Sequence, residues 1–288
     1  MAEVTHTTGK EWDKVAPVFF DGLAESPTDA PTAAMITALD NAYPLSQATT
    51  IMDNGCGTGP GTTMLIQKCA SMLPAGGVRI LATDFSAGMV EQVTEQRING
   101  LKDNNKLWEQ VETKVLDAHD LAGVEDGSIS HMMAGFVFFM VADPQKALQE
   151  ARRVLTPDNG GGVLAQTSWQ GSEWLDLLGL VKVVAPHAQL PQMPEAWTTT
   201  AGVREQLEKA GFRDVEAREV RAHLAFDDPV TTVNFFVRRL PLMAKVRAGL
   251  TADEIDRTCE LMIQHLREKY TQLPGRMVGT AILGVGRK

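Results

Sequence analysis

The segment 50–62 constrains the fold of this chain more than any other part of it. It reads TIMDNGCGTGPGT, a short apolar run that ends in Asp53 and leads into a loop with glycine at every second position, Gly55, Gly57 and Gly59. Glycine adopts positive φ at little cost and has no side chain to keep a ligand from the backbone. Apolar residues at helical spacing follow, so the loop is expected to join a strand to a helix N-terminus. In an open α/β sheet, ligands of the nucleotide type bind at such strand ends.

The spacing of the glycines decides which ligand the loop suits, because a single glycine loop also occurs in ordinary strand-to-helix turns. The dinucleotide pattern G-x-G-x-x-G fails, since Pro60 or Thr62 stands where its third glycine belongs. The Walker pattern fails as well, since neither Lys-Ser nor Lys-Thr follows the loop. The pattern that fits is acid-x-Gly-x-Gly-x-Gly, which resembles the first motif of class I S-adenosylmethionine-dependent methyltransferases. The resemblance implies that Asp53 and the three glycines bind S-adenosyl-L-methionine.

A second motif follows the next strand-like run, which ends at Asp84. The segment 84–89 (DFSAGM) is similar to the D-x-S-x-x-M motif of the same family. A carboxylate at this strand end can accept hydrogen bonds from both ribose hydroxyls, as it does in dinucleotide-binding folds. The resemblance therefore implies that Asp84, Phe85 and Met89 belong to the cofactor site.

Two later segments continue the resemblance in the same order along about half of the chain. Residues 115–121 (VLDAHDL) resemble the motif whose acid meets the adenine amino group, which implies that Asp117 and Ala118 read the adenine. The fourth strand is expected to end near Gly135, which is assigned to the cofactor site as well. Residues 143–157 then begin with Asp-Pro, open a helix and are similar to the family's D-P-x-x-x-L-x-E-x-x-R-V-L-x-P.

Length and composition exclude several classes of protein. The chain has 288 residues and a formal net charge of −9, which argues against binding to nucleic acid or to an anionic membrane. No apolar run approaches the roughly 18 residues of a membrane span, and no secretory signal is visible at the N-terminus. Three isolated cysteines lack the spacing of a metal site or a disulfide framework and suit a reducing cytosol. We expect a cytoplasmic enzyme that binds no metal.

The alternation of strand-like and helix-like segments predicts an α/β protein. Alternating strands and helices imply a parallel sheet with right-handed crossovers. The resemblance implies a Rossmann-like, seven-stranded, mostly parallel sheet with an antiparallel last strand, helices on both faces and a helical cap. The expected strands lie near residues 50–53, 78–83, 112–116, 129–137, 162–168, 214–225 and 276–285.

We expect a single domain over residues 1–288 with four parts. These are an N-terminal helical lid, a cofactor-binding core, substrate-cap helices with the sixth strand, and the last strand, at residues 1–48, 49–169, 170–275 and 276–288. Residues 12–19 (WDKVAPVF) are similar to the N-terminal Y/W-D-x-x-A-x-x-Y/F segment of one subgroup of the family. That subgroup contains ubiquinone/menaquinone-type and secondary-metabolite methyltransferases.

The same resemblance bears on the methyl acceptor. The chain lacks the Asp/Asn-Pro-Pro-Tyr element and the Pro-Cys nucleophile of enzymes that methylate DNA bases. We therefore expect a small-molecule acceptor, a thiol, a phenol or other hydroxyl, or an amine, in secondary or quinone-type metabolism. Aromatic rings attract a sulfonium cation by cation–π interaction. The candidates for the acceptor pocket are Trp12, Phe20, Phe136, Trp169 and Trp174.

Two alternatives stay open at this point. One is a protein on the same fold that binds S-adenosyl-L-methionine without transferring its methyl group, and the other is a methyltransferase that acts on a protein. No catalytic base is assigned, since His119, His187 and His223 stand in no recognisable dyad, and His131 is interpreted as a hydrogen-bonded core residue. An acceptor with a low pKa needs little help from a base, so a thiol or an acidic phenol is favoured.

Overall fold

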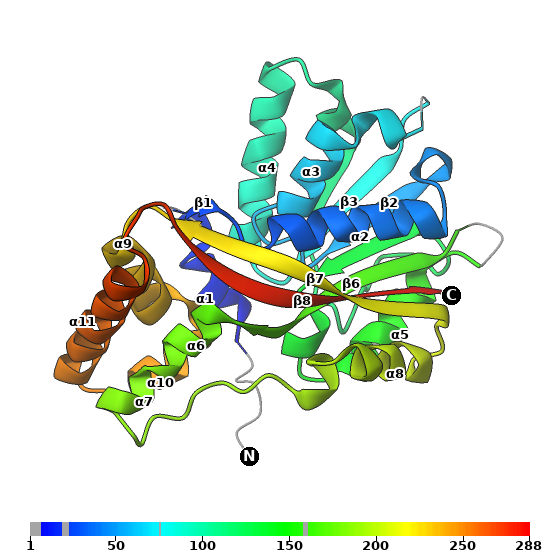
Figure 1. Ribbon diagram of the computed structural model, residues 1–288. Coiled ribbons are helices and arrows are strands. Elements are labelled where there is room, and N and C mark those ends of the chain that lie inside the picture. The colour runs from blue at the N-terminus through cyan, green and yellow to red at the C-terminus, as the bar shows by residue number, and fades with distance from the viewer. Residues whose placement is uncertain (1–6, 19–22, 75, 158–160) are drawn as a thin grey trace.

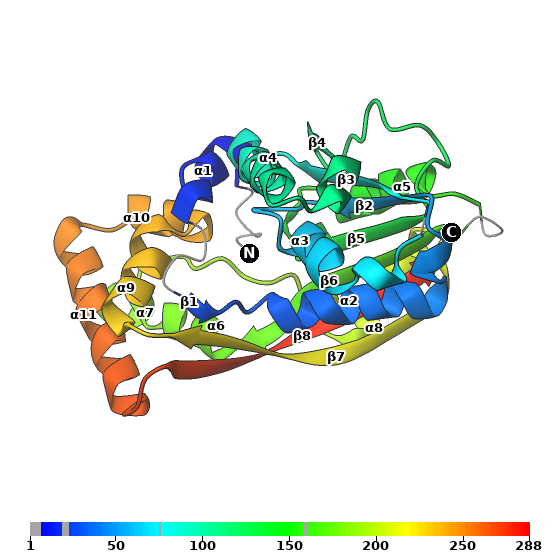
Figure 2. The same cartoon turned by 90° about the horizontal axis from the view of Figure 1, so that it is seen from above.

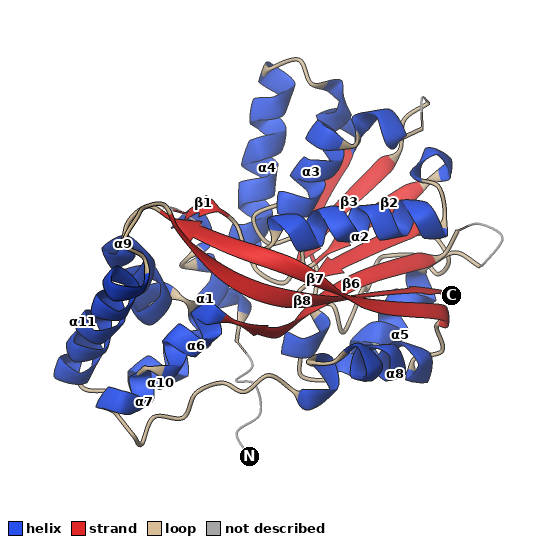
Figure 3. Ribbon diagram, in the orientation of Figure 1, coloured by secondary structure: helices blue, strands red, loops and turns tan. Residues whose placement is uncertain are grey.

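The computed structural model describes residues 7–18, 23–74, 76–157 and 161–288 (Figure 1). Figure 3 shows one continuous sheet, helices packed around it and a further group of helices at one end. The strands are β1 Leu23–Glu25, β2 Thr50–Asn54, β3 Arg79–Asp84, β4 Val111–Val115, β5 His131–Gly135, β6 Val163–Ser172, β7 Arg213–Phe226 and β8 Gly275–Arg287. The helices are α1 Gly9–Asp13, α2 Asp29–Ala42, α3 Pro60–Lys68, α4 Ala87–Lys102, α5 Pro144–Val154, α6 Glu173–Gly179, α7 Val181–Val184, α8 Thr200–Lys209, α9 Pro229–Asn234, α10 Ala244–Ala248 and α11 Ala252–Lys269.

The strands form a single eight-stranded sheet in the order β1-β7-β8-β6-β5-β2-β3-β4. β2 pairs in parallel with β3 and β5, β3 pairs in parallel with β4, and β5 pairs in parallel with β6. β8 lies antiparallel between β6 and β7. The seven expected strands and the antiparallel last strand are confirmed. The three-residue β1 adds an eighth strand, which pairs antiparallel with β7 at the edge.

The parallel strands bring their carboxyl ends to the same edge of the sheet. Asn54 at the end of β2 pairs with Thr83 of β3, and Gly135 at the end of β5 pairs with Thr167 of β6. The chain proceeds from β2 to β3 on one side, whereas β5 pairs with the other side of β2, so the strand order reverses at β2. Ligands of open α/β sheets bind at such a reversal, outside the carboxyl ends of the strands.

Helices cover both faces of the sheet because the inner strands are apolar on both faces. Successive side chains of a strand point to opposite faces. In β2, Ile51 packs into one core with residues of α2, α3 and α4. Met52 packs into the other core with residues of α5 and α8. The expected two-sided helix layers are thereby confirmed.

The expected lid, residues 1–48, contains a helix that belongs to the core. The buried side chains of α2 include Met35, Ile36 and Leu39, which pack into the same core as Ile51 of β2. α2 also contacts β6, β7 and β8, and Figure 2 shows it lying along the sheet. Residues 29–42 therefore form part of a helix layer, and a lid built from the residues before them stays a prediction.

The helical cap is built on the two longest strands, β7 and β8, which extend past the parallel strands (Figure 1). Leu177 of α6, Phe226 of β7 and Met262 of α11 share one hydrophobic core there. α11 begins with a capping box, in which the side chains of Thr251 and Glu254 each accept a hydrogen bond from the other residue's backbone N–H. Among the residues that the structure describes, no helix combines the length and the apolar character that crossing a membrane requires.

Replacement of Leu39 by alanine tests whether α2 belongs to the core. Leu39 is fully buried, and deletion of such a side chain costs about 2–5 kcal/mol. We expect Leu39→Ala to lower the free energy of unfolding by an amount in that range in urea denaturation. Thr37→Ala, at an exposed position of the same helix, is the control and should change it by less than about 0.5 kcal/mol. A loss for Leu39→Ala no larger than that of the control would contradict the packing of α2.

Candidate functional site

The glycine loop lies at the carboxyl end of β2 and is held by the end of β3. The N–H groups of Gly55 and Cys56 both donate to the carbonyl oxygen of Thr83, at 2.8 Å each. The N–H of Gly57 donates to Oδ2 of Asp84 at 2.9 Å. The loop and the acid at the end of β3 therefore form one hydrogen-bonded unit.

The three glycines of the loop are required for different physical reasons. Their φ angles are +74° at Gly55, +54° at Gly57 and +90° at Gly59, in a region that residues with side chains rarely adopt. A Cβ at Gly55 would lie 2.3 Å from Cγ2 of Val137, and one at Gly59 would lie 3.0 Å from Cγ2 of Val93. A Cβ at Gly57 would meet nothing within 4 Å. Gly55 and Gly59 thus permit close packing of the protein, whereas Gly57 borders space from which a ligand can approach the backbone.

Asp53 holds the first turn of the helix that follows the loop. Its Oδ2 accepts hydrogen bonds from the N–H of Thr62 at 2.9 Å and from the Thr62 hydroxyl at 2.8 Å. Burial raises the pKa of Asp53 to about 6, against the effect of these two bonds, and the negative charge of Asp84 adds to the rise. These contacts shape the loop and α3, and a direct contact of Asp53 with the cofactor stays a prediction.

Asp84 offers hydrogen-bond acceptors at the strand edge. Its Oδ2 receives the Gly57 N–H and its Oδ1 receives the Ser86 N–H, both at 2.9 Å. Burial raises the pKa of Asp84, and repulsion by Asp13 adds to the rise. The backbone amides of Ser86, Gly57 and Phe85 lower that pKa in opposition. An ionised carboxylate has about four acceptor positions, so Asp84 retains capacity for the hydroxyls of a ribose.

Phe85 and Met89 flank the start of α4 in different surroundings. The Phe85 side chain is 41% exposed directly after β3, which leaves a large apolar ring available to a ligand. Met89 is buried against Val15 and Ala16 of the N-terminal segment. Its N–H donates to the Ser86 hydroxyl at 3.1 Å, which caps α4. The structure therefore places Phe85 at the surface of the site and Met89 beneath the N-terminal segment.

Asp117 and His119 form a hydrogen-bonded pair beyond the end of β4. Oδ1 of Asp117 accepts the His119 N–H and lies 2.9 Å from Nδ1 of His119. Nε2 of His119 accepts the N–H of Asp143 at 2.9 Å, so the neutral ring carries its proton on Nδ1. Both ring nitrogens are engaged, which makes His119 unsuited to act as a base. The Asp117 side chain is 56% exposed and can meet a ligand, whereas Ala118 is buried.

Phe136, Trp169 and Trp174 form a contiguous aromatic wall. The rings of Phe136 and Trp169 stack with centroids 4.2 Å apart, and Trp174 meets Trp169 edge-on at 5.0 Å. Phe136 has a φ of +60°, and its N–H donates to the carbonyl oxygen and the hydroxyl of Thr167. Such a conformation costs about 1–3 kcal/mol and is common at ligand sites. The wall follows directly on Gly135, the last residue of β5.

The other two candidates for the pocket do not join this wall. Trp12 lies in α1, is partly buried and packs against Ala16 and Met89. Its Nε1–H donates to the Thr7 hydroxyl at 2.7 Å. Phe20 lies outside the described residues. Contact of either residue with an acceptor stays a prediction.

Two further histidines have contacts away from the strand ends. His131 is the first residue of β5, and its ring nitrogens lie 2.9 Å from the Tyr43 carbonyl oxygen and 2.9 Å from the Ser130 hydroxyl. His131 is fully buried and both ring nitrogens have partners, which confirms its interpretation as a hydrogen-bonded core residue, and burial lowers its pKa. Nε2 of His187 lies 3.3 Å from the Gly249 carbonyl oxygen in the cap. Neither set of contacts suits a base for methyl transfer at the glycine loop.

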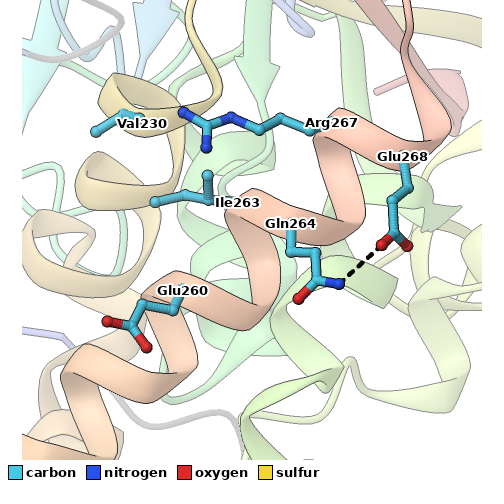
Figure 4. A pocket seen from close by; sticks show the side chains of 6 residues that line it. All are labelled: Val230, Glu260, Ile263, Gln264, Arg267 and Glu268. Carbon is cyan, nitrogen blue, oxygen red and sulfur yellow. Dashed lines mark hydrogen bonds between the residues drawn. The ribbon is translucent and has the colours of Figure 1, made fainter.

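A surface hollow on the cap is separate from this site. It is lined by Val230 of α9 and by Glu260, Ile263, Gln264, Arg267 and Glu268 of α11 (Figure 4). In Figures 1 and 2, α11 lies at the far end of the molecule from β2, β3 and β4. Within the described ranges, no group of three or more His, Cys, Asp or Glu residues is arranged to hold a metal ion.

Two of the motifs are joined by hydrogen bonds that the sequence does not signal, from Ser86 and Gly88 to Asp13. The hydroxyl of Ser86, the serine of D-x-S-x-x-M, donates to Oδ1 of Asp13 at 2.6 Å. Asp13 is the acid of the N-terminal W-D-x-x-A segment. Each residue is part of a recognisable motif, but neither motif indicates that Asp13 and Ser86, 73 positions apart in sequence, are in contact.

Comparison with known proteins agrees with this arrangement. A family profile described as "Methyltransferase domain" matches residues 52–164. "Methyltransferase ucsB" of an Acremonium species is 33% identical over 278 residues, which are 96% of this chain and 94% of that protein. The demethylmenaquinone methyltransferase of Clavibacter sepedonicus is 31% identical over 186 residues, 60% of this chain and 69% of that protein. The crystal structure of the 4+2 cyclase SpnF shares the fold, with 18% identity, a TM-score of 0.56 and 99% of both chains covered.

Replacement of Asp84 by alanine tests its assignment as the ribose acceptor. We expect Asp84→Ala to weaken binding of S-adenosyl-L-methionine at least about tenfold, because the ribose hydroxyls and the Gly57 N–H lose their acceptor. Isothermal titration calorimetry measures the affinity, and thermal melting verifies that the variant is folded. Glu109→Ala, at an exposed acid before β4, is the control and should bind as the wild type does. Unchanged affinity in Asp84→Ala would refute the assignment.

The pKa of Asp53 predicts how stability depends on pH. Because folding raises that pKa from 3.8 to about 6, the folded protein holds the proton more tightly and loses stability relative to the unfolded chain as pH rises from about 4 to about 7. Two pKa units correspond to about 3 kcal/mol. We expect apo-Asp53→Asn to resemble the wild type near pH 4 and to be more stable by up to about 3 kcal/mol at pH 7. Urea denaturation across this range measures the difference, and a difference independent of pH would contradict the prediction.

Proposed function

We propose that this chain, which belongs to the class I S-adenosylmethionine-dependent methyltransferase family, methylates a small aromatic acceptor that ionises readily. A relative that is 33% identical over nearly the whole of both chains shows that the chain belongs to this family. The enzyme is a methyltransferase, and its cofactor is S-adenosyl-L-methionine. The acceptor is the proposed part, and a phenol is the first candidate, with a thiol next.

The observation that carries the proposal is the position of the aromatic wall. Val137, the residue after Phe136, packs on the glycine loop so closely that a Cβ at Gly55 would lie 2.3 Å from its Cγ2. The wall of Phe136, Trp169 and Trp174 therefore begins beside Gly55, the first glycine of the loop. Phe136 and Trp174 are buried and Trp169 is half-buried, so we expect a flat apolar acceptor to meet the wall at Trp169. This supports an aromatic acceptor over a small polar one.

The residues at the strand ends fit the cofactor. Asp84 has acceptor capacity for the ribose, Phe85 presents an exposed ring beside it, and the backbone at Gly57 is open to close approach. Asp117 is exposed at the neighbouring strand end, where the adenine amino group is expected. S-adenosyl-L-methionine contains no phosphate, and the glycine loop matches neither of the two phosphate-binding patterns.

The mechanism follows from positioning. Bound S-adenosyl-L-methionine supplies an electrophilic methyl group on a positively charged sulfur. Asp84 and the loop hold one reactant, while the stacked rings of Phe136 and Trp169 orient the other and exclude water. Such alignment accounts for about 7–11 kcal/mol of a barrier. An aromatic face near a cation contributes about 0.5–2 kcal/mol more.

The contacts of His119 and His131 support an acceptor that ionises without a dedicated base. Both ring nitrogens of His119 have partners, and His131 is buried at the opposite edge of the sheet. An alkyl alcohol needs a base to become nucleophilic, whereas a phenol or thiol of low pKa needs little help. The resemblance to demethylmenaquinone methyltransferase supports a role in quinone-type or secondary metabolism. Three free cysteines, Cys56, Cys69 and Cys259, support the reducing cytoplasm as its compartment.

The second candidate function is catalysis on the same fold without methyl transfer. It is favoured by the fold shared with the 4+2 cyclase SpnF. Cofactor binding does not separate the two functions, because both need the same loop. Transfer of label from the cofactor does separate them.

Methyl-labelled S-adenosyl-L-methionine offered with a panel of acceptors tests the proposal. We expect label in phenols or quinols of one to three rings, more slowly in aromatic thiols, and none in alkyl alcohols, because His119, the histidine beyond the end of β4, has both ring nitrogens engaged. Liquid chromatography with mass spectrometry identifies the product. Label transferred only to a protein, or stoichiometric binding with no transfer to any acceptor of the panel, would overturn the proposal.

Truncation of the wall gives a residue-level prediction. We expect Trp169→Ala to lower kcat/KM for the aromatic acceptor about 10–100-fold, because a ring contributes roughly 1.5–3 kcal/mol when it is buried against a partner. The KM for S-adenosyl-L-methionine should change less than about twofold. Trp169→Phe keeps a flat face and is the matched control, expected to retain most of the activity. Equal activity in Trp169→Ala and the wild type would remove the wall from the acceptor site.

A further inference from the structure

The N-terminal segment 7–18 docks on the turn that follows β3. α1 and the 3-10 turn Ala16–Val18 both contact α4. Val15 and Ala16 are buried against Met89 in the first turn of α4. In Figures 1 and 2, α1 lies between α4 and the cap helix α10. A segment that precedes the whole sheet in sequence is thus packed beside the cofactor site.

Asp13 makes the polar contact of this docking. Its Oδ1 accepts the Ser86 hydroxyl at 2.6 Å and the Gly88 N–H at 2.9 Å. These two bonds, and to a lesser extent the charge of Lys10, hold the pKa of Asp13 below its ordinary range, although partial burial opposes them. Asp13 is therefore an ionised carboxylate that caps the first turn of α4 from another part of the chain.

Two glycines allow the backbones of the two segments to approach. A Cβ at Gly88 would lie 2.9 Å from Cα of Asp13, and a Cβ at Gly9 would lie 2.6 Å from the carbonyl oxygen of Phe85. Gly88 is the second residue of α4, where alanine would be the better helix former. The absence of a side chain at Gly88 thus serves the docking and not the helix.

The docking bears on the carboxylate that accepts the ribose. Ser86 donates its hydroxyl to Asp13 and its N–H to Oδ1 of Asp84 at 2.9 Å. On the other side of the segment, Glu11 lies close enough to Arg247 of α10 for their opposite charges to attract. The segment therefore lies between the cap and the cofactor side of the sheet.

We propose that Asp13 is a positioning residue that latches the segment 7–18 against the cofactor site and sets how long the cofactor stays bound. It acts through Ser86 and Gly88 and contacts neither cofactor nor acceptor. With the latch formed, the segment shields the Asp84 side of the site from water. With the latch broken, the segment leaves and the cofactor dissociates faster. The proposal rests on cofactor binding, which does not depend on which acceptor is methylated.

Three variants of the full chain test the latch. Asp13→Ala removes the acceptor of two hydrogen bonds, so we expect S-adenosylhomocysteine to dissociate about tenfold faster in stopped-flow fluorescence. Asp13→Asn keeps an oxygen at the Oδ1 position and should stay within about twofold of the wild type. Gly88→Ala keeps every polar group, but its Cβ would displace Asp13, so it should dissociate as fast as Asp13→Ala. The bound compound should protect the chain from trypsin after Lys10 and Lys14 in the wild type and Asp13→Asn only.

Glu91→Ala, at an exposed acid on α4, is the matched control and should leave dissociation and protection unchanged. Thermal midpoints of the apo-variants show which of them are folded. Unchanged dissociation in Asp13→Ala, or in a stably folded Gly88→Ala, overturns the proposal. An equal acceleration in Asp13→Asn overturns it as well, since the hydrogen bonds would then be irrelevant. Because S-adenosylhomocysteine binds without an acceptor, the proposed acceptor can fail while this test stands.

Discussion

Three backbone N–H groups fasten the glycine loop to a carbonyl oxygen and a carboxylate of the neighbouring strand, and the remaining geometry of the site depends on this attachment. Gly55 and Cys56 share the Thr83 carbonyl oxygen, while Gly57 donates to Asp84. A buried donor that loses its acceptor costs about 1–3 kcal/mol, so the loop cannot leave β3 without leaving such groups unpaired. Positive φ at the glycines lets the chain reach these acceptors within a few residues.

The parallel half of the sheet was predictable because its signals are local. β2 is a short apolar run buried on both faces, with Ile51 in one core and Met52 in the other. α5 begins with Pro144 after the capping Asp143, as the sequence indicates. α2 was not separated from the expected lid, because its place is set by contacts with β6, β7 and β8 that no local spacing encodes. β1 is three residues long and exists through its pairing with β7.

The features of the site differ in the same way in how far the sequence predicts them. The positive φ of the loop glycines and the acid at the end of β3 each depend on a single segment, so a short sequence motif can predict them. The pairing of His119 with Asp143, and that of Asp13 with Ser86, arise only when separate segments meet. Phe136 adopts positive φ without being glycine, which no propensity signals. Its stacking on Trp169 depends on β6 lying beside β5, so the wall is a product of the sheet and not of either strand alone.

Negative charge gathers around the cofactor position, and this has a consequence for turnover. Burial raises the pKa of both Asp53 and Asp84, and repulsion between neighbouring acids adds to the rise. An arrangement of this kind is unfavourable in the empty protein and is relieved by a cation. S-adenosyl-L-methionine carries a sulfonium charge, and methyl transfer removes it. We therefore expect the carboxylates to attract the methylated form of the cofactor more strongly than the spent form.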